Sequence, residues 1–441
     1  MRILDYVVDP LFRGPTLGSV LMCIAASLVG GIVVLRKRSL LGETLAHAAY
    51  PGVLLALTVA SQFFSNPLDE GVLPLVLLGA SIAAWLALNL IRALEKRRVR
   101  PDSALCFVLA SFFGFGLLFA SRLQVVLPKW YQQAESFLFG QTVTMTDQDI
   151  WLYGGLVLTV LSLVILFFKE LQVVSFDAEF AQTLGVRAQW ADRLFTLLLV
   201  AAVVIGLRSV GVVLMSAMLI IPAITARQFC HRLPVLLTIA ALVGGASGFL
   251  GTILSVEGGE WLSEQLQRSM ALATGPSIVL TAALFCVLAL LLAPERGLVI
   301  KTLRMARFRM KCLDENLLKA IWRARGAMIG PETLAEWVGS AQTWVRWRLW
   351  RLIRQGWVVH RDASWHLTED GHARATQIVR LHRLWELYLT DYLGLGVERV
   401  HRNAEEIEHI LTPDIERQLV DLLNQPAFDP HKQPIPPGRA T

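Results

Sequence analysis

Charged residues are scarce in this chain. Asp, Glu, Lys and Arg make up 17% of its 441 residues, whereas 54% are hydrophobic. A soluble protein usually carries about a quarter charged residues. This deficit excludes a disordered or fibrous chain and argues against an ordinary soluble enzyme. It predicts instead a protein with a large membrane-embedded part.

Cysteine motifs and nucleotide-binding motifs are also lacking. The five cysteines are widely spaced and form no CxxC pair, which argues against a disulfide framework. The dipeptide Gly-Lys never occurs, so the chain has no GxxxxGK[ST] phosphate-binding loop. The N-terminal segment has two acidic residues and a proline but no small-residue cleavage site, which is unlike a removable signal peptide.

Long apolar runs fill the first two thirds of the chain. A transmembrane helix needs about 20 apolar residues, or as few as about 17. We expect about nine such helices, and two shorter runs around Arg208 should form a tight hairpin. The candidate runs cover residues 17–35, 44–64, 72–91, 103–120, 150–168, 194–207, 210–226, 234–254 and 277–292.

Basic residues follow every second apolar run. They lie after the first, third, fifth, seventh and ninth runs, whereas the alternate loops 65–71 and 255–276 are acidic or nearly neutral. By the positive-inside rule, the N-terminus is outside the cell and the long C-terminal segment is cytoplasmic. This alternation also argues against a soluble helical bundle.

A carboxylate and an imidazole lie at the start of the second run. Glu43 and His47 are four residues apart, so they share one face of a helix. These donors suit a divalent transition metal, and Pro51 and Gly52 could break the helix nearby, as at transport sites. From spacing alone, a Glu–His pair that satisfies itself near the lipid headgroups is an equally good interpretation.

A short amphipathic segment lies between the fifth and sixth runs. Phe176, Phe180 and Leu184 form one helical stripe, which Asp177 can cap and Gly185 can end. Such a helix could lie on the lipid surface. It could also dock in a groove of a cytosolic partner.

Three motifs together resemble the ABC-3 family of metal-ion permeases, the membrane subunits of manganese, zinc and iron importers. They are GETLAHAAYPG (42–52), SFDAEFAQTLGV (175–186) and LRSVGVVLMSAMLIIPAITAR (207–227). The resemblance covers roughly residues 15–295. It implies that Glu43, where the family usually has Asp, and His47 contact the metal ion in the translocation path.

The same resemblance implies several partners. The second motif would be the coupling helix, and a separate ABC ATPase subunit would bind ATP, so the chain itself would not be an enzyme. An extracytoplasmic metal-binding protein and a second permease subunit, either a copy or a sister chain, are also implied, in the cell (inner) membrane. The residues expected to contact the ATPase are Phe176, Asp177, Glu179 and Phe180.

The last third of the chain has a different composition. Seven of the nine histidines and eight of the thirteen tryptophans follow residue 300. A basic juxtamembrane segment, 296–313, should lie against anionic lipid. The pattern that follows predicts a winged helix-turn-helix, with helices at 314–325, 331–338 and 341–355 and strands at 357–360 and 365–367.

The third of these helices is strongly basic. We expect its arginines to contact DNA, although a solvated face against lipid headgroups would have the same composition. The predicted DNA contacts are Arg346, Arg348 and Arg351. Three tryptophans on this helix are expected in the core or at a partner contact. They are Trp344, Trp347 and Trp350.

A cluster of histidines and acidic residues follows. Two helices with donors at these spacings can hold one or two first-row divalent ions. A charged, solvated helix pair is the weaker alternative, since six ligand-type residues lie close together in the sequence. They are His382, Glu386, His401, Glu405, Glu408 and His409.

Residues 314–438 resemble the diphtheria-toxin-repressor family of metal-dependent regulators, through LHRLWE (381–386) and VHRNAEEIEH (400–409). The resemblance implies one metal site from His382, Glu386 and His401, and a second site around Glu405, Glu408 and His409. Glu405 stands where iron-type members have Cys, which favours Mn²⁺. The family's ligand near Asn316 would be replaced, or supplied by a neighbour such as Glu315.

The expected fold is an all-α polytopic membrane domain followed by a cytosolic winged helix-turn-helix and a helical metal-binding and dimerisation domain. The expected boundaries are 1–295, a linker at 296–313, 314–370 and 371–441. The chain would be the permease of an ATP-driven divalent-metal importer, for Mn²⁺ or Fe²⁺ and less favourably Zn²⁺, fused to a regulator that binds a DNA operator. Such fusions resemble Ytg-type metal uptake systems.

Two alternatives stay open at this point. The chain could be a membrane-tethered, metal-sensing transcription regulator without transport activity. Its C-terminal part could instead be a metal-gated brake on the permease.

Overall fold

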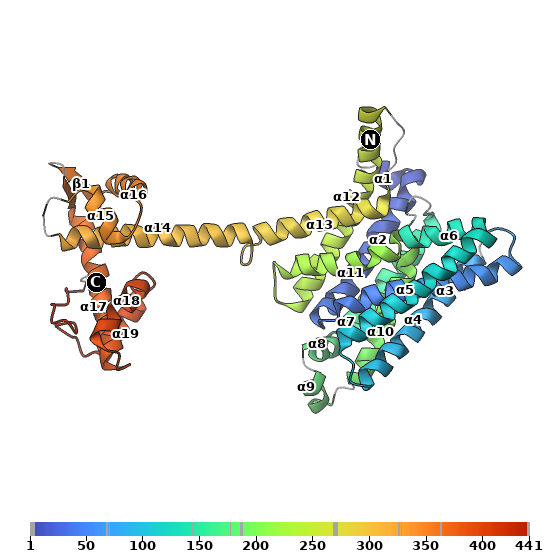
Figure 1. Ribbon diagram of the computed structural model, residues 1–441, viewed down its shortest axis with the longest axis horizontal. Helices are drawn as coiled ribbons and strands as arrows, with labels where there is room; N and C mark the ends of the chain where they lie inside the picture. The colour runs from blue at the N-terminus through green and yellow to red at the C-terminus, as the bar shows by residue number, and fades with distance from the viewer. Residues whose placement is uncertain are drawn as a thin grey trace. The chain divides into compact units, whose positions relative to one another are not determined.

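The computed structural model describes residues 5–438 except for 68, 70, 141, 143–144, 177, 186–187, 268–271, 325–326, 328 and 362–363 (Figure 1). Further side chains within helices are not described, namely those of residues 139, 176, 178, 179, 188, 189, 208, 209, 213, 214, 397, 399, 402 and 406. The chain divides into two compact units, Met1–Ile300 and Lys301–Thr441.

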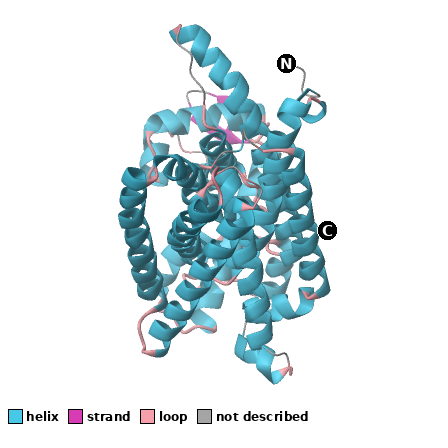
Figure 2. Cartoon of the chain, turned by 90° about the vertical axis from the view of Figure 1, so that its right-hand side faces the viewer, coloured by secondary structure: helices cyan, strands magenta, loops and turns pink. Residues whose placement is uncertain are grey.

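The described part of the first unit has no β-strand. Figure 2 shows that the described chain is mostly helical, with one small sheet. Its helices are α1 (Asp5–Val8), α2 (Pro10–Leu35), α3 (Ser39–Phe63), α4 (Val72–Lys96), α5 (Pro101–Val126), α6 (Pro128–Phe139), α7 (Asp147–Leu166), α8 (Phe168–Phe176), α9 (Ala178–Thr183), α10 (Ala188–Val210), α11 (Val212–Arg227), α12 (Leu233–Leu266) and α13 (Thr274–Leu292).

Among the described residues, eight helices are long and apolar enough to cross a membrane, namely α2, α3, α4, α5, α7, α10, α12 and α13. The apolar segment Met215–Arg227 of α11 is shorter and makes a ninth. This agrees with the expected number. Only Gly211 separates α10 from α11, and its φ of 86° is one that glycine adopts without strain. The chain therefore changes direction at Gly211, three residues after the position expected for the turn.

Helix α2 lies at the centre of the first unit. It packs against α7, α10, α11 and α12, and most of its residues are buried. Small residues permit this close packing, because membrane helices gain little from the hydrophobic effect and associate through tight contacts. At Gly30, an added Cβ would lie 1.8 Å from the carbonyl oxygen of Leu219 in α11.

The structure differs from the sequence prediction at three helices. Helix α3 continues unbroken through Pro51 and Gly52. Helix α12 continues to Leu266, through part of the segment expected to be a loop. Its 34 residues span roughly 50 Å, so its polar end extends beyond a hydrocarbon layer about 30 Å thick. The helix expected to start at Asp314 begins at Leu298, within the basic segment.

The second unit combines helices with a small sheet. Its elements are α14 (Leu298–Arg323), α15 (Pro331–Val338), α16 (Gln342–Arg354), β1 (Val358–Arg361), β2 (Ser364–Leu367), α17 (Glu369–Asp391), α18 (Val397–Ile407) and α19 (Pro413–Leu422). The strands are antiparallel, with Val358 opposite Leu367 and Arg361 opposite Ser364. Helix, helix–turn–helix and hairpin follow one another as in the predicted winged helix-turn-helix.

The helix-turn-helix has a hydrophobic core of its own. Buried side chains of α14, α15, α16 and β1 meet there, including Leu318, Leu334, Leu349 and Val358. Gly339 turns the chain between α15 and α16 with a φ of 63°, a helix-ending conformation that favours glycine. The Thr368 hydroxyl accepts a hydrogen bond from the Gly371 amide and caps α17.

Substitution of Gly30 tests the close packing of α2. Gly30→Ala should lower the free energy of unfolding by roughly 1–3 kcal/mol, because the new methyl group meets a backbone carbonyl that can move only with its helix. Gly114→Ala is the control, since a Cβ at Gly114 meets no described atom within 4 Å. Thermal unfolding in detergent should show a lower Tm for Gly30→Ala alone. Equal Tm values would contradict the packing.

Candidate functional site

The predicted transport residues both lie on α3, and both are half-buried. The imidazole of His47 packs edge-on against the ring of Phe113 in α5, with ring centroids 4.7 Å apart. Its Nδ1 atom is buried, and no hydrogen-bond partner for it is found among the described residues. A buried polar atom without a partner is rare and calls for an explanation. A metal ion passing this point would provide one.

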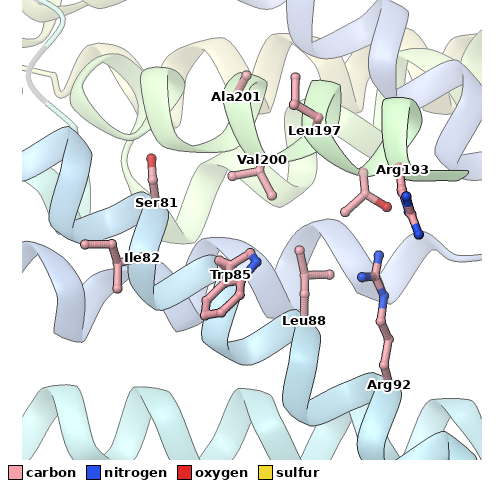
Figure 3. Close-up of a pocket in the computed structure, with 10 residues that line it drawn as sticks. Ser81, Ile82, Trp85, Leu88, Arg92, Arg193, Leu197, Val200 and Ala201 are labelled. Carbon is pink, nitrogen blue, oxygen red and sulfur yellow. The ribbon is translucent and has the colours of Figure 1, made fainter. Parts of the chain in front are cut away.

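A separate cavity in the first unit has different chemistry. About 620 Å³ in volume, it lies between α4 and α10 (Figure 3). Apolar side chains such as Trp85 and Leu197 line it, and Arg92 and Arg193 stand together at one end. Its described lining has no carboxylate or imidazole. This cavity therefore does not fit a divalent cation.

The predicted coupling segment contains the last two residues of α8 and the whole of α9. Phe180 is 55% exposed. Gly185 follows α9 with a φ of 76°, as expected of a residue that ends a helix. Asp177 and the side chains of Phe176 and Glu179 lie outside the described residues.

Three of the predicted metal ligands come together in the second unit. His382 and Glu386 lie on α17, and His401 lies on α18. The Glu386 Oε1 atom is 3.1 Å from His382 Nε2 and 2.8 Å from His401 Nδ1, and the two nitrogens are 3.0 Å apart. Metal–ligand bonds of about 2.0–2.2 Å place adjacent ligands roughly 3 Å apart. These three atoms fit one first-row divalent ion.

Hydrogen bonds hold this triad in place without a metal. Burial would raise the pKa of the Glu386 carboxyl, but hydrogen bonds from His382 and His401 outweigh it and lower the pKa to about 2. Burial would lower the pKa of His382, but hydrogen bonds to Glu386 and Glu408 raise it. The carboxylate therefore stays ionised and ready to bind a cation.

A cavity of about 530 Å³ opens beside the triad and gives a ligand access to it. His431 lines this cavity, and its Nε2 atom is 4.0 Å from Glu386 Oε1. The sequence prediction missed His431, because it is far from the other ligands along the chain and belongs to no helical pattern with them. It is a further candidate ligand.

The three residues predicted for a second site have other partners. The Lys319 ammonium group donates to both carboxylate oxygens of Glu408, at 2.8 and 2.9 Å. The Nδ1 atom of His409 lies 2.8 Å from a carboxylate oxygen of Glu315. Glu405 is half exposed, and its nearest oxygen is 3.8 Å from Lys319. Among the described residues, these three do not form a donor group like the triad.

Arg348 has a different place from the one predicted. The side chain is buried, with 1% of the residue exposed, and its guanidinium pairs with the carboxylate of Asp314 in α14. The Nε atom is 2.6 Å from Asp314 Oδ1. Arg348 is next to Leu349 on the buried stripe of α16, so it links α16 to α14 and is not available to DNA.

The other predicted DNA contacts are exposed. Arg346 and Arg351 both lie on the solvent side of α16. The three tryptophans of this helix are also exposed, at 54%, 45% and 54%, which excludes the core alternative within this chain. They are Trp344, Trp347 and Trp350.

Two protein families match different parts of the chain. Residues 9–293 match the ABC 3 transport family. Residues 368–437 match the iron dependent repressor, metal binding and dimerisation domain. Both resemblances expected from the motifs are thereby confirmed.

Similar proteins span nearly the whole chain. A "Probable metal transport system membrane protein" of Chlamydia trachomatis serovar D is 33% identical over 97% of this chain and 96% of its own length. The "Manganese transport system membrane protein MntC" of Bacillus subtilis strain 168 is 39% identical over 90% of this chain and 87% of its own length.

A solved structure resembles the first unit. "PsaBC from Streptococcus pneumoniae in complex with Fab" is 26% identical, covers 67% of this chain and 96% of that chain, and gives a TM-score of 0.55. Together with the apolar helices and the match over more than half of the chain, these likenesses show that the protein is a multi-pass membrane protein that belongs to the ABC 3 transport family.

Proposed function

We propose that this chain is the permease subunit of an ATP-driven importer of a divalent transition metal, fused to a metal-dependent regulator. The observation that carries the transport proposal is the buried, unpartnered Nδ1 atom of His47 on the helix that also bears Glu43. An imidazole nitrogen and a carboxylate at this spacing suit a passing metal ion. The family to which the chain belongs supports the same function.

The proposed transport step uses alternating access. Glu43 and His47 would take over part of the ion's hydration shell while the permease is closed on one side, and release the ion when it opens on the other. Mn²⁺ is the favoured substrate, since a relative 39% identical to the chain is named for manganese transport. Fe²⁺ and Zn²⁺ have similar ligand preferences.

The proposed partners supply the parts of an ATP-driven importer that this sequence does not contain. The sequence has no phosphate-binding loop, so a separate ABC ATPase subunit would bind ATP and contact the segment that contains Phe180. An extracytoplasmic metal-binding protein would deliver the ion, and a copy or a sister permease subunit would complete the pathway. The alternating loop charges support an inner-membrane orientation with the N-terminus outside and the C-terminal unit in the cytoplasm.

The proposed regulator senses metal through the triad of His382, Glu386 and His401. A divalent ion bound there would be coordinated by His382 and Glu386 of α17 and by His401 of α18, and would so link the two helices. The exposed Arg346 and Arg351 would then bind DNA phosphates, in a dimer whose two α16 helices reach successive major grooves. Such a regulator would repress uptake genes when cytosolic metal is plentiful.

A specific observation favours a second function for the C-terminal unit. The three exposed tryptophans of α16 share this helix with Arg346 and Arg351. Large exposed aromatic side chains often mark a protein or membrane contact. The unit could therefore act as a metal-gated brake on the permease, without binding DNA.

Glu43→Gln and His47→Ala test the transport site. Each should reduce metal uptake at least about tenfold, because loss of a ligand weakens ion binding by 1.4 kcal/mol or more. Uptake of radioactive Mn²⁺ by proteoliposomes with the cognate ATPase is the measurement. Glu95→Gln, another partly buried glutamate, is the control. Normal uptake by both site variants would overturn the assignment.

The regulatory metal site has its own test. Glu386→Gln together with His401→Ala should weaken Mn²⁺ binding by the C-terminal unit at least about 100-fold, since the first change removes the carboxylate charge and the second removes a ligand nitrogen. Electron paramagnetic resonance of free Mn²⁺ during titration of the full-length protein in detergent measures this. The exposed His372 on the same helix is the control, as His372→Ala. Unchanged binding in the double variant would contradict the site.

The DNA hypothesis predicts a salt signature. Arg346→Ala and Arg351→Ala should each weaken binding and reduce the slope of log affinity against log salt by about one. The probe is a duplex from the region upstream of the protein's own gene, measured by fluorescence anisotropy with Mn²⁺. Arg417→Ala, on an exposed residue of α19, is the control. Absence of DNA binding even at low salt would favour the brake.

A further inference from the structure

The second predicted metal site already holds a cation, the ammonium group of Lys319. This side chain is only 5% exposed. Its Nζ atom lies 2.8 and 2.9 Å from the two oxygens of Glu408, 3.4 Å from His382 Nδ1 and 3.8 Å from the nearest oxygen of Glu405. The lysine therefore sits among three of the side chains expected to bind metal.

An ammonium group and a divalent ion cannot share this position. A metal ion bound to Glu408 would need the same carboxylate lone pairs at about 2 Å, well within the space that Nζ fills. The two positive charges would also repel each other strongly in a buried place. A second ion could enter only if the Lys319 side chain left.

The surroundings hold Lys319 in place. Its neighbours Leu318 and Ile321 on α14 belong to the hydrophobic core of the helix-turn-helix, so the backbone is anchored. An ammonium group that leaves Glu408 would also leave that fully buried carboxylate without its lysine partner, and breaking a buried ion pair is costly.

The remaining donors do not favour a second ion either. His409 is paired with Glu315, which also accepts a hydrogen bond from Arg374. Both groups would have to exchange partners before they could bind metal. Asn316, near the position where the resembled family supplies a ligand, carries an uncharged amide.

Lys319 also supports the first site. Through Glu408 it is connected to His382, whose Nδ1 atom contacts a Glu408 oxygen. When Nδ1 carries the proton and donates to this carboxylate, Nε2 is left free to face Glu386 and His401. A carboxylate behind a ligating histidine commonly fixes its tautomer and orientation in this way.

We propose that Lys319 is a built-in cation that takes the place of a second divalent ion, so that the C-terminal unit binds one metal ion and not two. This inference rests on the proposed regulatory metal site. It makes Lys319 a positioning residue and limits the stoichiometry of the sensor. The single remaining site then responds to metal without help from a neighbouring ion.

The test counts metal ions in the full-length protein. Purified chain in detergent is equilibrated with Mn²⁺, and bound manganese per chain is measured by mass spectrometry together with the electron paramagnetic resonance spectrum. The variants are Lys319→Glu, which replaces the ammonium group by a ligand, and Lys319→Gln, which keeps a hydrogen-bond donor. Lys301→Glu, on an exposed residue of the same helix, is the control.

The expected results are specific. Relative to the wild type, Glu386→Gln with His401→Ala should lose one ion, and His409→Ala should lose none. Lys319→Glu should gain one ion and show the spectrum of two exchange-coupled manganese ions, and Lys301→Glu should do neither. Lys319→Gln should stay folded, judged by thermal unfolding, and should bind at least as many ions as the wild type.

Three results would overturn the inference, and the two that leave the proposed function standing are distinguishable from the third. Loss of an ion from His409→Ala, or a coupled spectrum in the wild type, would show that a second ion displaces Lys319 while the proposed function stands. No loss from the Glu386→Gln, His401→Ala variant would remove the proposed site itself.

Discussion

A buried carboxylate needs a positively charged partner nearby, and this requirement determines which side chains pair in the C-terminal unit. Among the residues that the structure describes there, each of the five buried acidic side chains contacts a basic group. The pairs are Asp314 with Arg348, Glu315 with Arg374 and His409, Glu386 with His382 and His401, Glu408 with Lys319 and His382, and Asp429 with Arg383. Most of these contacts join segments far apart in the sequence, so charge compensation connects α14 to α16, to α17 and to the residues that follow α18. The triad of His382, Glu386 and His401 is the part of this network in which we propose that a divalent ion binds.

The same requirement separates the two proposed metal positions. In the C-terminal unit, the triad is satisfied by mutual hydrogen bonds before any ion binds. On α3, the Nδ1 atom of His47 is buried without a partner among the described residues. A sensor gains from a stable, preformed site, whereas a transport position should hold its ion weakly enough to release it. One chain thus combines a permease with a sensor suited to the same class of ion.

The sequence predicted the elements better than their contacts. Apolar runs located the membrane helices, and i, i+4 spacing brought His382 and Glu386 together. The prediction that Arg348 contacts DNA was wrong because it rested on the residue type. The position of Arg348 beside Leu349 on an apolar stripe indicates burial. The pairing of Lys319 with Glu408 joins residues 89 positions apart, and no local spacing reveals it. The early start of α14 was missed because a run of exposed basic residues has no apolar periodicity.

Anomalous X-ray diffraction from crystals of the full-length protein soaked in Mn²⁺ tests the central claim most directly. The account predicts one peak in the C-terminal unit, between His382 Nε2, Glu386 Oε1 and His401 Nδ1, with the Lys319 ammonium group still on Glu408. A second peak beside Glu408 and His409, or no peak at the triad, would contradict it.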